Sequence, residues 1–224
     1  MSTPAAASPS GPVPRRSRAF IVGDSTLLAV RNYKTFKSFR GFDYEFDARS
    51  CRTLGIVSCG RRPKPLNTVE AIEHADGRFD VVVVMAGYDE WWTSFPSSFD
   101  AVVAAARAKG ASTIVWLGYR EDVVYENPDG VRGAEAYIKN NETLREKVAE
   151  PAYSDVVVLD WNTYSSAAPS WMAADGIHLT VAGAHGVADY ISRMIAHLDD
   201  RPCPITPQPT TEVCPNPDTV GPSG

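Results

Sequence analysis

Short runs of consecutive apolar residues, separated by longer stretches with helical periodicity, constrain the fold of this chain most. Residues 80–85 read Asp-Val-Val-Val-Val-Met, and residues 156–159 read Val-Val-Val-Leu. Strands that are apolar at every position are typical of a parallel sheet covered by helices on both faces. We therefore predict a three-layer, doubly wound (flavodoxin-like) α/β domain with a mostly parallel five-stranded sheet. The predicted strands are 19–22, 43–47, 80–85, 112–117 and 155–159, and the predicted helices are 26–33, 67–75, 97–109, 133–149 and 180–198.

Two polar motifs flank these elements. Gly-Asp-Ser at 23–25 follows the first predicted strand, and Asp-Gly-Ile-His at 175–178 precedes the last predicted helix. A serine nucleophile needs an imidazole to accept its proton and a carboxylate to orient that imidazole. The sequence therefore predicts Ser25 as nucleophile, His178 as base and Asp175 as the orienting acid. Ser25 is expected at the carboxyl edge of the sheet, where open α/β sheets bind their ligands.

The order of these motifs resembles that of the SGNH or GDSL hydrolases. The first block reads Val-Gly-Asp-Ser-Thr-Leu over 22–27, and the last reads Asp-Gly-Ile-His-Leu-Thr over 175–180. The resemblance covers roughly residues 19–198 and implies a serine hydrolase that uses no metal or organic cofactor. The alternative interpretation is that Ser25 caps a helix, while Asp175 and His178 only close a loop.

In the SGNH family, two motifs between the first and last blocks supply donors to the oxyanion hole. They are usually a Gly after the second strand and a Gly-x-Asn after the third. Here residues 46–52 read Phe-Asp-Ala-Arg-Ser-Cys-Arg, with Cys51 at the Gly position, and residues 86–90 read Ala-Gly-Tyr-Asp-Glu. The resemblance therefore implies a hole formed by the N–H groups of Ser25 and Cys51 together with Asp89. Asp89 departs from the family pattern, because an ionised carboxylate cannot donate a hydrogen bond to an oxyanion.

Several further residues are predicted to contact the substrate. Trp91 and Trp92 follow the third strand, and adjacent aromatic residues in such a loop cannot both face the core, so one is expected to form a platform for a sugar or acyl group. Arg120 follows the fourth strand and suits a carboxylate or a sugar hydroxyl. The predicted substrate-binding set is Asp24, Gly87, Tyr88, Trp91 and Arg120.

Composition indicates one domain without a nucleic-acid partner. A chain of 224 residues with 44% hydrophobic content can bury a full core. The net charge of -5 and the pI near 5.4 argue against binding to nucleic acid. Basic residues cluster at 15–18, 31–40 and 61–64, which we interpret as solvated surface. The alternative is that Lys34, Lys37 and Arg40 help to hold an anionic substrate.

The four cysteines form two close pairs in the sequence, whose spacing fits neither a zinc ribbon nor a thioredoxin motif. Two local disulfides or four buried thiols remain as alternatives. The Pro-rich surroundings of the second pair offer too little apolar content to bury a thiol, which favours disulfides and an extracytoplasmic or secreted location. Local pairing is predicted because each pair brackets one loop. The predicted bridges are Cys51 with Cys59 and Cys203 with Cys214.

The two ends of the chain differ in composition from its centre. Residues 1–17 have the composition of a flexible linker and lack the apolar region of a signal peptide, which indicates the extracytoplasmic part of a longer anchored chain or a domain separated from its leader. Residues 18–199 are predicted to form the hydrolase-like domain. Residues 200–224 are a Pro-rich tail, expected to be mobile unless the second disulfide holds it. No stretch of about 20 apolar residues occurs, so no membrane span is predicted.

Together these features predict a serine esterase or O-acyltransferase of the cell envelope. Its substrate would be an acylated carbohydrate or a small ester, processed through an acyl-enzyme. The alternative is a catalytically impaired SGNH scaffold that serves as a carbohydrate-binding or partner-docking domain. Asp89 is the residue that favours this alternative.

Overall fold

The computed structural model describes residues 16–59, 63–124, 133–204 and 212–220. A five-stranded sheet forms the central layer of the fold. All neighbouring strands are parallel, in the order β2-β1-β3-β4-β5. This confirms the predicted doubly wound fold, with a sheet that is wholly rather than mostly parallel. The strands are β1 (Arg18–Gly23), β2 (Asp43–Ala48), β3 (Val81–Met85), β4 (Thr113–Leu117) and β5 (Val156–Leu159).

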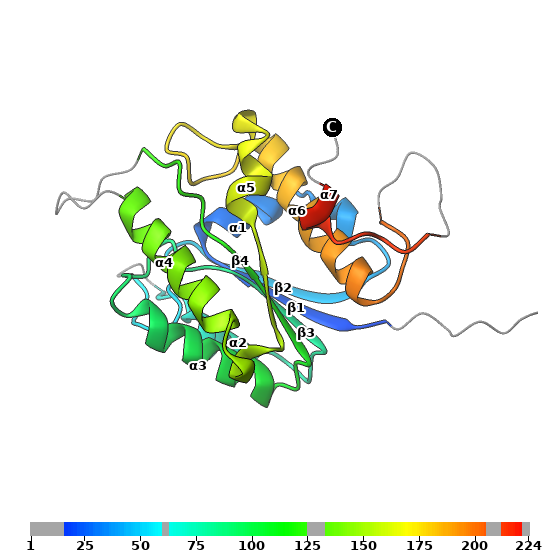
Figure 1. Cartoon of the computed structure of the whole chain (residues 1–224), viewed down its shortest axis with the longest axis horizontal. Coiled ribbons are helices and arrows are strands. Elements are labelled where there is room, and N and C mark those ends of the chain that lie inside the picture. Colours follow the sequence, from blue (N-terminus) through cyan, green and yellow to red (C-terminus); the bar gives the residue numbers. More distant parts are fainter. Residues whose placement is uncertain (1–15, 60–62, 125–132, 205–211, 221–224) are drawn as a thin grey trace, which may run out of the picture.

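Helices cover both faces of the sheet (Figure 1). One face carries α1 (Ser25–Asn32), α5 (Trp161–Ser166) and α6 (Val181–Leu198). The other carries α2 (Thr68–His74), α3 (Phe95–Ala108) and α4 (Gly133–Val148). Shorter helical elements are η1 (Phe36–Phe39), η2 (Pro151–Tyr153), η3 (Pro169–Trp171) and α7 (Pro217–Val220).

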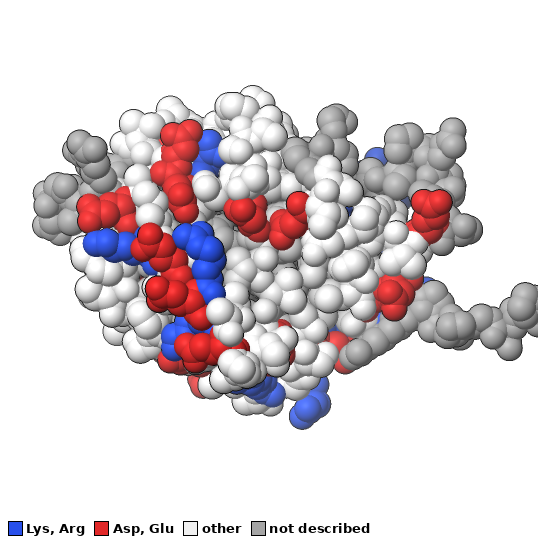
Figure 2. Space-filling view, in the orientation of Figure 1, with Lys and Arg blue, Asp and Glu red and all other residues white. Residues whose placement is uncertain are grey.

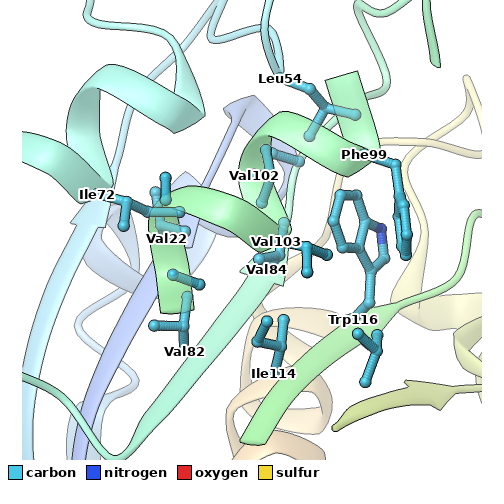
Figure 3. Close-up of a cluster of buried hydrophobic side chains, with 14 of the residues drawn as sticks. Val22, Leu54, Ile72, Val82, Val84, Phe99, Val102, Val103, Ile114 and Trp116 are labelled. Carbon is cyan, nitrogen blue, oxygen red and sulfur yellow. The ribbon is translucent and has the colours of Figure 1, made fainter. Parts of the chain in front are cut away.

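Two apolar clusters fill the spaces between sheet and helices, because successive strand residues point to opposite faces. Phe20 and Val22 of β1 join the cluster under α2 and α3, whereas Ala19 and Ile21 join the cluster under α1 and α6. Figure 3 shows the first cluster, in which Trp116 of β4 lies against Phe99 of α3. The continuous apolar runs in the sequence therefore reflect strands that are buried on both faces.

Charged side chains gather on the outside of the helical layers. Figure 2 shows acidic and basic residues interspersed over α4. Lys139 and Glu135 form an ion pair there, one helical turn apart. Such mixed charge is typical of a solvated helix face.

The chain ends are more closely attached to the domain than the sequence predicts. The N–H and hydroxyl groups of Ser17 donate to the carboxylate of Asp199. A disulfide joins Cys203 to Cys214, and the Cys214 side chain is buried. The Tyr190 hydroxyl on α6 bonds to Asp218 of α7. The predicted boundaries at 17 and 199 therefore cut through packed structure, whereas most of the predicted linker and parts of the tail lie outside the described residues.

The carboxyl ends of β1 and β3 form the switch point of the sheet. The chain leaves β1 towards β2 on one side, and it leaves β3 towards β4 on the other. Loops at such a point diverge and leave a crevice that binds ligands in many α/β proteins. Within the described ranges, none of the helices combines the length and hydrophobicity of a membrane span.

Candidate active site

A tight turn at the end of β1 places Ser25 at this switch point. Gly23 has no room for a side chain, because a Cβ atom there would lie 2.7 Å from the Met85 carbonyl oxygen. Asp24 follows as the N-cap of α1 and accepts a hydrogen bond from the Thr26 N–H at 2.9 Å. Ser25 is consequently the first residue of the helix.

The loop before α6 holds His178 and Asp175 through its own hydrogen bonds. Asp175 Oδ1 accepts from the N–H groups of Ile177 and His178 at 2.9 and 3.0 Å. Gly176 has φ +74°, a left-handed conformation that glycine adopts without cost. The Val124 N–H donates to the Asp175 carbonyl and joins this loop to the segment that follows β4.

The side chains of Ser25, His178 and Asp175 form a continuous hydrogen-bonded series. Ser25 Oγ lies 3.1 Å from His178 Nε2, and His178 Nδ1 lies 2.7 Å from Asp175 Oδ2. Partial burial acts to raise the pKa of Asp175, but hydrogen bonds from the His178 ring and two backbone N–H groups outweigh it, so the pKa is lowered. An ionised Asp175 accepts a hydrogen bond from the Nδ1–H group, which leaves Nε2 unprotonated and able to accept the Ser25 proton.

A disulfide-closed loop after β2 approaches the same turn. Cys51 is bonded to Cys59, as local pairing predicts, and has φ +68°, a conformation that glycine usually fills. Arg52 is buried and donates to the carbonyl groups of Gly23 and Asp47. Among the hydrogen bonds of the described residues, the N–H groups of Ser25 and Cys51 have no acceptor. Both donors are therefore available to a ligand.

Asp89 lies in the loop after β3 and interacts electrostatically with His178 and Asp24. Partial burial of its carboxyl raises the pKa, and positive charge on His178 opposes that effect. Three arginines of the neighbouring loops form ion pairs with other carboxylates: Arg49 and Arg52 pair with Asp47, and Arg120 pairs with Asp122. Within the described part of the chain, Asp89 therefore has no ion-pair partner.

Asp24 is fully buried, which corrects its prediction as a substrate-binding residue. Its Oδ2 accepts from the N–H groups of Gly87 and Tyr88 at 3.0 and 3.1 Å. Burial raises the pKa of Asp24 to about 6, with Asp89 adding to the shift and the backbone N–H donors opposing it. This carboxyl therefore joins the turn after β1 to the turn after β3, and its oxygens are occupied by protein donors.

Tyr88 and Arg120 are likewise buried rather than open to a substrate. The Tyr88 ring packs edge-on against Tyr119 and Tyr137, and its hydroxyl accepts the Arg120 N–H. The Arg120 guanidinium donates to the Ser165 hydroxyl at 3.0 Å. Both residues support the loop walls, because aromatic packing and hydrogen bonding within the fold occupy them.

Gly87 is a buried turn residue, whereas Trp91 lies at the surface. Gly87 has φ +113°, and a Cβ there would collide with the Tyr119 hydroxyl, so only glycine fits. Trp91 is 44% exposed. Trp92 is partly buried, with the Lys139 ammonium 4.1 Å from its ring centroid. Trp91 is thus the member of the pair available to a ligand.

The structure contradicts the idea that Lys34, Lys37 and Arg40 hold a substrate near Ser25. Asp43, the first residue of β2, pairs with Arg18, the first residue of β1. The chain from 33 to 42 therefore returns to the amino edge of the sheet, opposite the edge that carries Ser25.

Sequence reasoning missed Glu90, which is 3% exposed. Its two carboxylate oxygens accept from the Leu54 N–H at 2.9 Å and from the hydroxyls of Ser94 and Ser98 at 2.8 Å. Glu90 thus fastens the disulfide-closed loop to the start of α3. A glutamate beside a predicted surface loop carries no sequence signal of burial, because its partners come from distant segments. Within the described residues, no group of three or more His, Cys, Asp or Glu side chains could hold a metal ion.

Comparison with solved structures identifies the fold. A protein from Slackia heliotrinireducens assigned to the SGNH hydrolases superposes with TM-score 0.58 at 20% identity, covering 80% of this chain and 98% of that one. The C-terminal catalytic domain of Streptococcus pneumoniae peptidoglycan O-acetyltransferase A, solved with a methylsulfonyl adduct, superposes with TM-score 0.57 at 19% identity. The match covers 84% of this chain and 97% of that one. This chain has the SGNH/GDSL hydrolase fold.

A third SGNH-like match is a protein from Agrobacterium tumefaciens assigned as an arylesterase, with TM-score 0.53 at 14% identity, covering 78% of this chain and 96% of that one. No protein-family model and no curated protein matches the sequence. The likeness to the SGNH fold is therefore one of architecture, and function must be argued from the site.

Replacing Asp24 by Asn tests its role as the central support of the site. An amide cannot accept from all three backbone N–H groups, so one buried donor loses its partner and we expect a loss of about 1–3 kcal/mol in unfolding free energy. The pKa of Asp24 is about 6 in the folded protein, above its ordinary value of 3.8. As pH rises between these values, Asp24 therefore loses its proton more readily in the unfolded chain, and the free energy of unfolding of the wild type falls. Urea denaturation across that pH range measures both effects. An Asn variant with wild-type stability and the same pH slope would contradict this role.

Proposed function

We propose that this protein is a serine esterase or O-acyltransferase. The observation that carries the proposal is the series from Ser25 Oγ to His178 Nε2 at 3.1 Å and from Nδ1 to Asp175 at 2.7 Å. These distances suit proton transfer from a hydroxyl to an oriented imidazole. The SGNH fold, shared with solved esterase-like and acyltransferase proteins, supports the same chemistry.

The proposed reaction has two half-reactions. Ser25 Oγ attacks the acyl carbonyl carbon while His178 takes the serine proton, and Asp175 stabilises the imidazolium that forms. The N–H groups of Ser25 and Cys51 face the developing oxyanion. His178 then donates its proton to the leaving alkoxide, which departs as an alcohol and leaves an acyl-serine. Attack by water gives a free acid, whereas attack by a sugar hydroxyl gives a new ester.

The proposed substrate is an acylated carbohydrate or small ester outside the cytoplasm. Exposed Trp91 offers an apolar ring face of the kind on which sugar rings pack. Disulfides form and persist in oxidising compartments, and this chain carries two. The peptidoglycan O-acetyltransferase domain with the same fold supports an envelope carbohydrate as substrate.

A second function, carbohydrate binding or partner docking by an impaired SGNH scaffold, is favoured by Asp89 alone. A carboxylate near the oxyanion opposes the negative charge that develops there. The N–H groups of Ser25 and Cys51 favour catalysis, because they have no acceptor among the described residues and leave two donors for the proposed oxyanion. We therefore give priority to the enzyme.

Serine and histidine variants test the reaction. We expect Ser25→Ala to remain folded and to lose about three orders of magnitude or more in turnover of 4-nitrophenyl esters, and His178→Ala to lose a similar factor. The double variant should lose no more than either single one, because the two groups act as one unit. Assays with and without sugar acceptors separate hydrolysis from transfer. Retained turnover in Ser25→Ala, or additive losses in the double variant, would refute the mechanism.

Asp89→Asn tests the departure from the family pattern. Because no arginine neutralises Asp89 within the described residues, we expect the amide to remove a repulsion and supply a donor. Turnover at neutral pH should rise by about tenfold or more, given that one oxyanion donor is worth roughly 10²–10³ in rate. Wild-type turnover should fall as pH rises through the raised pKa of Asp89, whereas the Asn variant should lack this fall.

The matched control is Asp76→Asn, which removes the same charge from an exposed residue between α2 and β3. It should leave turnover unchanged at every pH. If Asp89→Asn also matches wild type in rate and pH profile, Asp89 takes no part in the reaction and does not occupy the position of the family's Asn.

A further inference from the structure

A pocket of about 410 Å³ lies beside the loop that follows β2. Its walls include Asp47, Arg49, Ser50 and Arg52 on one side and the segment 63–66 on the other. None of these residues belongs to the Ser25, His178 and Asp175 series. The pocket therefore lies at the carboxyl end of β2 and is lined by residues outside the Ser25, His178 and Asp175 series.

The charged groups of this pocket do not balance. Asp47 accepts from Arg49 at 2.9 Å and from Arg52 at 2.6 Å, so one carboxylate faces two guanidinium groups. Lys64 also lines the pocket, and it has no carboxylate partner among the described residues. Positive charge is thus in excess here, on a chain whose net charge is -5.

Arg52 gives the pocket a rigid floor. Its side chain is 1% exposed, and its guanidinium donates to the carbonyl groups of Leu66 and Asp47 as well as to the Asp47 carboxylate. Arg49, in contrast, is 57% exposed and uses only its Nε atom in the bond to Asp47. Its remaining N–H groups and the Lys64 ammonium are available to an incoming ligand.

The pocket lies close to Ser25. The Arg49 N–H donates to the Gly23 carbonyl at 3.0 Å, and an Arg52 Nη1 atom approaches the same oxygen at 3.4 Å. Gly23 precedes Ser25 by two residues, which span at most about 7 Å of chain. The backbone of the pocket wall is therefore hydrogen-bonded to the turn that carries Ser25, two residues before the nucleophile.

We propose that this pocket binds an anionic group, a carboxylate or phosphate, carried by the substrate or acceptor of the Ser25 site. Arginine offers paired N–H donors that match carboxylate and phosphate oxygens, and lysine adds a mobile ammonium. The Ser50 hydroxyl supplies another donor at the pocket wall. The inference rests on the proposed function and narrows its substrate class to acidic or phosphorylated carbohydrates and esters.

Binding of simple sugars tests the pocket without turnover. Wild-type protein is titrated with glucuronate, glucose 6-phosphate and neutral glucose, and the Nε–Hε signals of arginine are followed by NMR. We expect saturable binding of one or both anionic sugars, weakened by added salt, and none of glucose. Comparison of the two anionic sugars shows whether a carboxylate or a phosphate is preferred.

Charge variants assign that binding to the pocket. Lys64→Gln and Arg49→Gln should each weaken it roughly fivefold, the effect of one nearby unit charge in water. Lys37→Gln is the matched control, because Lys37 is exposed on η1 at the opposite edge of the sheet and should have no effect. The proposal is overturned if neither anionic sugar binds, or if Lys64→Gln and Arg49→Gln bind as wild type does.

The same titration of Ser25→Ala separates this inference from the proposed function. Anion binding there should equal that of wild type, because Ser25 does not line the pocket. Absence of ester turnover in wild type with intact anion binding would count against the esterase alone. Turnover with no anion binding would count against the pocket alone.

Discussion

The buried carboxylate of Asp24 is the interaction on which the geometry of this site depends. One oxygen caps α1 through the Thr26 N–H, and the other binds two N–H groups in the turn after β3. These bonds fix the start of α1 against the loop that carries Asp89. Gly23 permits the close approach, because any side chain there would meet the Met85 carbonyl. Ser25 therefore projects from a support that is buried and hydrogen-bonded on two sides of the switch point.

The other walls of the site are attached to this support by polar contacts that reach across the fold. Arg52 bonds to the Gly23 carbonyl from the loop after β2, and Glu90 bonds to the Leu54 N–H from the loop after β3. The Cys51–Cys59 disulfide closes the loop that contains both Arg52 and Leu54. A buried polar group that loses its partner costs more than the bond is worth, so these groups hold the loop in one arrangement. The pocket proposed for an anion shares its floor, Arg52, with this framework.

The sequence predicts the layers well because the signals for them are local. Consecutive apolar residues mark strands covered on both faces, and each predicted strand lies within a residue or two of its observed bounds. The short helix α5 was not predicted, because Trp-Asn-Thr-Tyr-Ser-Ser has neither helical periodicity nor strong helix formers. Its start depends on the Asp160 cap, whose carboxylate accepts the Thr163 N–H.

The burial of Asp24, Tyr88 and Arg120 could not be predicted from the sequence. Each carries a polar group that looks suited to a ligand, and each instead makes hydrogen bonds to distant segments of the fold. Family resemblance places such residues in the right loops, but it does not say whether their side chains face solvent or core. The position of Lys34, Lys37 and Arg40 is a related case, since only the pairing of β2 with β1 shows that they lie at the far edge.

The central claim is that His178 activates Ser25 as a nucleophile. Labelling with a fluorophosphonate probe, followed by mass spectrometry of the labelled peptide, measures this directly because the probe reacts with activated serines. The account predicts a single adduct on Ser25 of the wild-type protein and its loss in His178→Ala. A folded wild-type protein that remains unlabelled, or that is labelled equally well without His178, would contradict the account.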